Sequence, residues 1–349
     1  MVAKDSRRTL TSLLFSLLLV AGGLFPVYSE EIQFIELDRV VAPGPVAIDR
    51  SSATTLHVLS INLNRFFDDI DDGNDEKVLS RKRFRQRIEI TSTALAEKFK
   101  LPDIIALQEV ENRNVLQQLA MEIQRRYRVE YQAVLIEGND VSGIDVGYLL
   151  RSDLTLKRSD ALFRTARASH NDIPLFSRPP LHIEICRSEK CFTLLNLHLR
   201  SMRGLSSAKK GDRVARKRRQ QAETLASWID RWQRDNPRRS LVVLGDLNAL
   251  TPADRHVDVV GIVRGNPDNR ATRLPGKDLL DPDLSDLTLS IPADRRYSFI
   301  FRGRNQQLDY MLVNHHFDAK LDAIAFASIE RDLSDHAGLY AMFSWQAAD

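Results

Sequence analysis

The most informative stretch of the sequence is Leu241-Val242-Val243-Leu244-Gly245-Asp246-Leu247-Asn248. Its four leading apolar residues are too few for a helix and are typical of a short strand that is buried on both faces. An acid, Asp246, and an amide, Asn248, follow this strand directly. Because strand ends collect distant parts of a chain at one edge of a sheet, polar residues at this position indicate a functional site.

Polar side chains also end or flank the other expected strands. The apolar patterns predict strands at 56–62, 103–108, 146–150, 192–197, 307–313 and 337–343, and helices at 80–100, 113–126 and 213–235. The polar residues at these strand ends are Asn62, Glu109, His198, Asp309, Asp335 and His336. Alternating strands and helices predict an α/β fold built in layers.

Composition and charge exclude several classes of protein. The chain has 349 residues, of which 43% are hydrophobic and 28% are charged, so it is neither disordered nor collagen-like nor a coiled coil. Its 50 basic and 47 acidic residues give a net charge of +3. This excess is too small for a protein that coats nucleic acid by bulk charge, so an anionic substrate would be held by local basic clusters.

The N-terminal region is expected to direct export. Three basic residues, Lys4, Arg7 and Arg8, precede an apolar run over 13–25, which is the layout of a signal peptide ending at Ser29. An uncleaved anchor is the alternative. We expect residues 1–29 to be the signal peptide, 30–53 an extension, and 54–349 one catalytic domain. The mature protein would be periplasmic or extracellular, without stable membrane insertion.

The only two cysteines, Cys186 and Cys191, are expected to form a disulfide. They flank a four-residue polar connection between two alternating segments, which predicts a β-hairpin. Opposed residues of a hairpin are close enough for a disulfide. Two unpaired thiols are the alternative, and a zinc site is not indicated because no histidine pair lies nearby.

The residues at the strand ends favour metal-assisted hydrolysis of phosphate esters. Carboxylate and amide oxygens are hard ligands that suit Mg²⁺ or Mn²⁺ better than Zn²⁺. Two histidines can stabilise the negative charge of a phosphate or protonate a leaving oxygen. The sequence contains neither a Gly-x-Ser-x-Gly turn nor a phosphate-binding glycine loop, so serine hydrolases and P-loop enzymes are not indicated.

The ordered motifs resemble the endonuclease/exonuclease/phosphatase superfamily, and within it secreted bacterial nucleases. They are Asn62, Gln108-Glu109-Val110-Glu111-Asn112, Asn196-Leu197-His198-Leu199, Gly245-Asp246-Leu247-Asn248, Leu308-Asp309-Tyr310 and Ser334-Asp335-His336. Supporting strings include Gly143-Ile144-Asp145-Val146-Gly147-Tyr148 and Phe176-Ser177-Arg178-Pro179-Pro180. The resemblance implies a DNase-I-like four-layer α/β sandwich, with two packed mixed β-sheets flanked by helices.

The resemblance also implies a metal site and a base. Glu109 would be the principal ligand of Mg²⁺, with Asn62 beside it and Asp335 assisting. Mn²⁺ is an alternative ion, and Ca²⁺ a further one. Asp246 would orient or deprotonate the attacking water, and Asn248 would hold Asp246 or the phosphate.

Further roles follow for the histidines. His336 would contact the scissile phosphate and be oriented by Asp309. His198 would act near the leaving group, with Asp145 as the candidate that orients it. Tyr310 stands where close relatives carry a histidine, with little expected consequence.

Two basic runs are candidate contacts for nucleic acid. Residues 81–87 hold five basic residues in seven, and residues 209–219 hold seven in eleven. The second run, with Arg200 and Arg203, is expected to follow a phosphate backbone, although Arg200 stands where relatives often carry a lysine. A solvated helix face is the alternative for each run.

An acidic stretch over 68–76 invites a Ca²⁺ interpretation. With Gly73 at the sixth loop position, Ile70 and Leu79 occupy positions that need oxygen ligands, so the EF-hand pattern fails. We expect a solvated loop, with an irregular Ca²⁺ site as the alternative.

The sequence therefore predicts a secreted or periplasmic metal-dependent nuclease. It would hydrolyse phosphodiester bonds of DNA, with RNA as a further substrate, through an activated water. One alternative is a phosphodiesterase acting on phospholipid or inositol phosphate, but no tryptophan falls in an expected membrane-facing loop. Another is a non-catalytic nucleic-acid-binding protein. No protein partner is implied.

Overall fold

The computed structural model describes residues 54–73, 75–169, 172–251, 255–270 and 272–346, which belong to one compact unit within 33–349. The expected signal peptide at 1–29 and extension at 30–53 lie outside the described residues. Among the residues described, no helix has the length and apolar character needed to cross a membrane.

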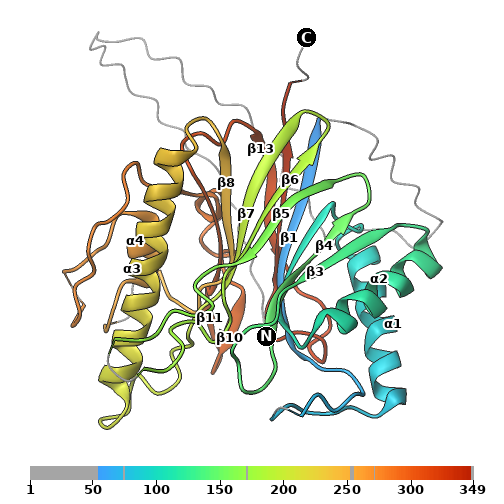
Figure 1. Cartoon of the computed structure of the whole chain (residues 1–349), viewed down its shortest axis with the longest axis horizontal. Helices are drawn as coiled ribbons and strands as arrows, with labels where there is room; N and C mark the ends of the chain where they lie inside the picture. The colour runs from blue at the N-terminus through green and yellow to red at the C-terminus, as the bar shows by residue number, and fades with distance from the viewer. Residues whose placement is uncertain (1–53, 74, 170–171, 252–254, 271, 347–349) are drawn as a thin grey trace, which may run out of the picture. The chain divides into compact units, whose positions relative to one another are not determined.

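Two six-stranded sheets form the centre of this unit (Figure 1). The first has the order β13-β14-β1-β2-β4-β3, with bounds Lys320–Ala327, Gly338–Ser344, Thr55–Phe66, Ile104–Val110, Asp145–Arg151 and Tyr131–Leu135. The second has the order β5-β6-β7-β8-β12-β9, with bounds Thr155–Ala161, Leu181–Arg187, Lys190–His198, Ser240–Asp246, Asp309–Val313 and Ser285–Asp286. A separate hairpin joins β10 (Phe299–Phe301) to β11 (Arg304–Gln306).

Each sheet contains one parallel pair at its centre. β1 runs parallel to β2, and β7 runs parallel to β8, while the other pairs are antiparallel. The carboxyl ends of β1 and β2 therefore meet at one edge of the first sheet, and those of β7 and β8 meet at one edge of the second. The mixed sheets agree with the expected fold.

Helices cover the outer face of each sheet, which gives four layers (Figure 1). The helices are α1 (Arg81–Glu97), α2 (Arg113–Tyr127), α3 (Gly211–Asp235), α4 (Val259–Arg264) and the short 3₁₀ helix η1 (Leu287–Ser290). Strand alternation explains the layering, because Val58 of β1 faces the second sheet while Leu59 packs beneath α1 and α2. The expected four-layer α/β sandwich is confirmed.

Local sequence sets where the first two helices begin. The hydroxyl of Ser80 accepts the backbone N–H of Arg83, and the side chain of Asn112 accepts the N–H of Val115, so both helices have a polar cap. Asn112 lies two residues after the end of β2, the strand that carries Glu109.

The acidic stretch over 68–76 is a surface loop with one buried acid. Asp68 is fully buried, and its carboxylate accepts the side-chain amides of Asn112 (3.2 Å) and Asn114 (3.0 Å). Asp71 and Asp72 are exposed, as expected for a solvated loop. Asp68 thus ties the loop to the start of α2.

Cys186 and Cys191 form the expected disulfide across the β6–β7 hairpin. Replacing both by serine is expected to lower the free energy of unfolding by about 2 kcal/mol, because the closed loop is short. Activity should persist, since Cys191 lies near the start of β7 and His198 at its end. Urea unfolding and hydrolysis assays of the variant measure the two effects. A large loss of activity in a folded variant would contradict the separation between hairpin and site.

Candidate active site

Three predicted residues become neighbours through the register of the second sheet. His198 is the last residue of β7 and pairs with Asp246, the last residue of β8. Asp309 is the first residue of β12 and pairs with Asp246 from the other side. The hydrogen-bonded ladder therefore places two carboxylates and an imidazole side by side.

Glu109 comes from an irregular point of the first sheet. The pairing of β2 with β4 shifts between Gln108 and Val110, so Glu109 is the extra residue of a β-bulge. Its φ is 59°, in the left-handed region that non-glycine residues rarely adopt. Such strain is typical of functional sites.

Asn62 joins the two sheets at the site. Its amide nitrogen donates to Glu109 Oε1 (3.2 Å) and to Asp246 Oδ2 (3.1 Å). His198 Nε2 lies 3.8 Å from Glu109 Oε1 and 3.5 Å from Asp246 Oδ2. Side chains from β1, β2, β7 and β8 thus meet in one group.

Asp246 is the centre of this group. The backbone N–H of Asn248 donates to its Oδ1 (2.8 Å), and the Asn248 side chain donates to its Oδ2 (3.2 Å). Burial raises the pKa of Asp246 to about 7; Asp309 and Glu109 act in the same direction, while His336 and the Asn248 bond oppose the shift. A carboxylate with a pKa near neutrality suits proton transfer.

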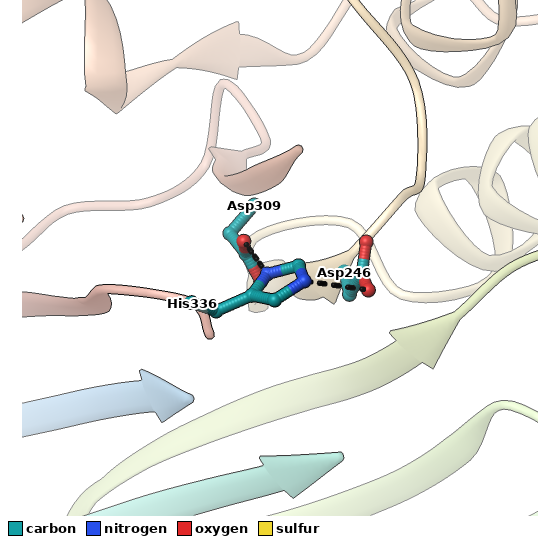
Figure 2. A group of neighbouring side chains, drawn as sticks. All are labelled: Asp246, Asp309 and His336. Carbon is teal, nitrogen blue, oxygen red and sulfur yellow. Dashed lines mark hydrogen bonds and ion pairs between the residues drawn. The ribbon is translucent and has the colours of Figure 1, made fainter. Parts of the chain in front are cut away.

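His336 completes the group from the loop before β14 (Figure 2). Its Nδ1 lies 2.7 Å from Asp309 Oδ2, and its Nε2 lies 3.9 Å from Asp246 Oδ2. Burial lowers its pKa, but the charges of Asp309 and Asp246 outweigh burial and raise the pKa to about 10. The ring is therefore a cation at neutral pH.

Ser334 holds this loop against the first sheet. Its hydroxyl donates to the backbone carbonyl of Asn62 (2.6 Å) and accepts the N–H of His336 (2.9 Å). The position of His336 thus depends on the end of β1, where Asn62 lies.

His198, unlike His336, has a neutral ring. Burial, Arg178 and His336 hold its pKa well below the usual value. The site therefore contains one neutral imidazole and one imidazolium around a shared carboxylate. Pairs of groups whose pKa values are driven apart are typical of acid–base and electrostatic catalysis.

The donor set fits a divalent cation. Carboxylate oxygens of Asp246 and Asp309 and a ring nitrogen of His336 lie within 4.8 Å of one another. The protonated His336 ring has no lone pair for a metal, so the carboxylates are the candidate ligands, and Asp309 Oδ1 is buried without a hydrogen-bond partner. Two carboxylates beside the Glu109 carboxylate form a hard-oxygen environment of the kind that Mg²⁺ or Mn²⁺ binds. Asp335, the third residue expected at the metal, has an exposed side chain.

Three other predicted residues lie outside the central group. Asp145 is buried at the start of β4, where its Oδ2 accepts the N–H of Gly138 (2.9 Å); the described residues show no hydrogen bond from Asp145 to His198. Arg200 donates to the Ser201 hydroxyl (2.7 Å), and its pKa is lowered by burial and Arg178. Arg203 is exposed. Their roles stay predictions.

Arg178 is a positioning residue that sequence reasoning did not single out. It forms an ion pair with Asp140 (2.7 Å) and donates to the carbonyls of His198 and Leu199, both at 3.3 Å. It therefore holds the chain where β7 ends. The signal was available, because Arg178 lies in one of the strings that carry the family resemblance.

Each basic run supplies one arginine that supports the site from within. Arg218 of the second run is fully buried and donates to the carbonyls of Arg200 (2.6 Å) and Asn248 (2.7 Å). Arg87 of the first run is half-buried and donates to the carbonyl of Asn64 (2.9 Å), just beyond Asn62. Sequence reasoning treated these runs only as outward-facing charge.

A buried amide pair lies beneath the site. Gln108 Nε2 donates to Asn196 Oδ1 (2.8 Å), so β2 of the first sheet is hydrogen-bonded to β7 of the second. Asn196 Nδ2 in turn donates to the carbonyls of Leu107 (3.1 Å) and Gly147 (3.0 Å). This pair connects the two sheets two residues before His198.

The family is shown by comparison with known sequences. The profile of the Endonuclease/Exonuclease/phosphatase family matches residues 58–326, so the chain belongs to this family. The match spans the strands that carry Asn62, Glu109, His198, Asp246 and Asp309. No curated protein matches the chain in sequence.

Solved structures share the fold at low sequence identity. Truncated TDP2 from Caenorhabditis elegans is 18% identical over 83% of this chain and 98% of its own, with a TM-score of 0.52. The endonuclease/exonuclease/phosphatase from Bacteroides vulgatus is 16% identical over 84% of this chain and 100% of its own, with a TM-score of 0.55. TDP2 from D. rerio, complexed with a single-strand DNA product, is 17% identical over 83% and 99%, with a TM-score of 0.54.

Proposed function

We propose that the protein is an exported, divalent-metal-dependent nuclease that hydrolyses phosphodiester bonds of DNA, and of RNA as a further substrate. The observation that carries this proposal is the position of Asp246 between His198 and His336. A buried carboxylate with a pKa near 7 can accept a proton from water at neutral pH. The cationic ring beside it can stabilise a phosphate.

Three residues of the site would have separate roles in the hydrolysis. Asp246 would take a proton from the attacking water, because Asn62 and Asn248 hold its oxygens in place. His336 would bind a phosphate oxygen, with Asp309 orienting its ring. The neutral ring of His198 lies 3.5 Å from Asp246, so it would contact the leaving oxygen at the same site.

Glu109 would hold the cation, with Asn62 beside it and the unpartnered Oδ1 of Asp309 as a further oxygen of the group. When bound, a divalent cation supplies neutralisation of the phosphate charge and polarisation of the phosphoryl group. Glu109 is suited to this role because its side chain is 20% exposed, whereas that of Asp246 is 2% exposed. Asp335 would assist only if its exposed side chain turned toward the site.

Nucleic acid is the substrate favoured by the surroundings of the site. Arg200 and Arg203 follow the strand that carries His198, and the TDP2 structure from D. rerio was solved with a single-strand DNA product. Export is supported by the disulfide, because disulfides persist in oxidising compartments.

A phospholipid is the second candidate substrate. Ile300 and Phe301 are exposed on the β10–β11 hairpin, which meets the requirement for an apolar loop that could contact a membrane. The position of this hairpin beside His336 makes it relevant to either substrate.

A substrate panel tests the proposal. Purified protein is incubated with supercoiled plasmid, linear duplex, single-stranded DNA, RNA and sphingomyelin vesicles, with and without Mg²⁺. We expect metal-dependent cleavage of nucleic acid that weakens steeply with salt, because phosphate contacts release counterions. Turnover of sphingomyelin alone would reject the nuclease proposal in favour of the second candidate.

A further inference from the structure

The β10–β11 hairpin is attached directly to the candidate active site. Phe299 forms a β-bridge with His336, and their ring centroids lie 5.0 Å apart. At the base of the hairpin, the carbonyl of Ser298 accepts the N–H of Ala337 (2.7 Å), and the Ser298 hydroxyl accepts the N–H of Asp309 (3.2 Å). The hairpin therefore extends outward from the segments that carry His336 and Asp309.

The hairpin combines exposed apolar side chains with unopposed positive charge. Ile300 is 56% exposed and Phe301 is 48% exposed, so two large apolar residues that are adjacent in sequence lie at the surface. Residues 295–307 contain four arginines and no acid. Two of these arginines, Arg302 and Arg304, are exposed near the tip, and the guanidinium of Arg302 lies 5.3 Å from the Phe301 ring centroid.

Strand alternation gives the two faces of the hairpin different characters. Successive side chains of a strand point to opposite faces, so Phe299 and Phe301 share one face and Ile300 lies on the other. Phe301 pairs with Arg304, and Ile300 pairs with Asn305. The face that packs on His336 through Phe299 therefore also carries the Phe301 ring and the Arg304 guanidinium farther out.

We propose that this face binds the nucleic-acid substrate beside the scissile phosphate. Phe301 would stack on an unpaired base, while Arg302 and Arg304 would bind flanking phosphates; this inference rests on the proposed nuclease function. Phe301 is about 7 Å beyond Phe299 along the strand. That is roughly two nucleotides of a stacked strand at about 3.4 Å each. Because stacking on an aromatic ring requires an unstacked base, the enzyme should prefer single-stranded or frayed ends.

Nucleic acid and a lipid surface would use the two faces of the hairpin differently. A hairpin tip that inserts into a membrane would bury Ile300 and Phe301 together. A strand of nucleic acid that enters the site along the His336 face would contact Phe301 and miss Ile300. The two adjacent residues therefore form a matched pair that separates the two ligands.

Phe301→Ser is compared with its matched control, Ile300→Ser, and with an Arg302→Gln/Arg304→Gln double variant. kcat/KM is measured with Mg²⁺ on a short single-stranded oligonucleotide and on bis(p-nitrophenyl) phosphate, which has neither a nucleobase nor flanking phosphates. We expect Phe301→Ser to lower the ratio of the two values about tenfold, chiefly through KM. Ile300→Ser should stay within about twofold of wild type, and the double variant should bind oligonucleotide with a shallower salt dependence.

The outcomes are distinguishable. Equal effects of Phe301→Ser and Ile300→Ser on the oligonucleotide ratio would overturn the inference while leaving the nuclease proposal in place. If Phe301→Ser and Ile300→Ser both lost binding to phosphatidylcholine/phosphatidylserine vesicles, the hairpin would be a membrane contact instead. A wild-type protein that hydrolyses the small phosphodiester but no nucleic acid would reject both proposals. If Phe301→Ser fails to fold, the double variant still decides, because an unchanged salt dependence would contradict the phosphate contacts.

Discussion

Replacing Asp246 with asparagine is expected to lower kcat on a phosphodiester substrate by about 10³-fold, within the range for loss of a positioned general base. The amide cannot accept a proton from water, and it places a neutral group between His198 and His336. KM should change much less, because the residues expected to contact phosphate remain. Steady-state kinetics on plasmid or oligonucleotide measure the two parameters separately.

Asp286→Asn is the matched control for this variant. Asp286 is also a buried carboxylate of the second sheet, on β9, and it accepts the N–H of Thr288 outside the site. Burial raises its pKa, so a neutral side chain should be tolerated there. A folded Asp246→Asn variant with wild-type kcat would contradict the assignment of the base.

Removal of divalent ions with EDTA is expected to abolish hydrolysis, and added Mg²⁺ or Mn²⁺ should restore it. Loss of the charge neutralisation that a cation supplies is worth several kcal/mol, which corresponds to two or more orders of magnitude in rate. Glu109→Gln should show the same loss at any attainable Mg²⁺ concentration. In a thermal-unfolding assay, Mg²⁺ should raise the Tm of wild type, since an ion that binds only the native state stabilises it. It should raise the Tm of the variant much less.

Glu111→Gln serves as the control for Glu109→Gln. The two acids are close in sequence, but Glu111 is buried and accepts the N–H of Asp68 (2.5 Å) in the adjoining loop. Burial raises its pKa to about 7, so its neutral form is already tolerated. If both variants lost the Mg²⁺-dependent rise in Tm, the ion would not be bound by Glu109 in particular.

The layered fold and the edge that holds the site were predictable from short-range patterns. The strands before Glu109 and Asp246 contain continuous apolar runs at 104–107 and 241–244, and such runs identify central strands because both of their faces are buried. The strand before Asn62 was marked by alternation instead. The edge strand β5, Thr155–Ala161, is largely polar and has no fully buried residue, so no apolar alternation marked it. Long-range pairing with β6 determines its structure, and a local pattern does not contain that information.

The finer geometry of the site was not predictable. No local pattern marks the β-bulge at Glu109, because the bulge arises from how β2 pairs with β4 on one side and β1 on the other. The burial of Arg218 depends on the carbonyls of Arg200 and Asn248, which lie far away in sequence. The ordered motifs indicated which residues meet, whereas their charge states required the burial of His198 and the partners of His336.

The buried amide pair of Gln108 and Asn196 sets the alignment of the two halves of the enzyme. Aliphatic side chains between two sheets pack almost equally well after a small slide, but a buried amide–amide hydrogen bond is satisfied in one alignment only. Asp246, the proposed general base, stands on the second sheet, and the Glu109 carboxylate stands on the first. The pair therefore fixes the register between the two sheets, and it keeps carboxylates from separate sheets within reach of a single phosphate.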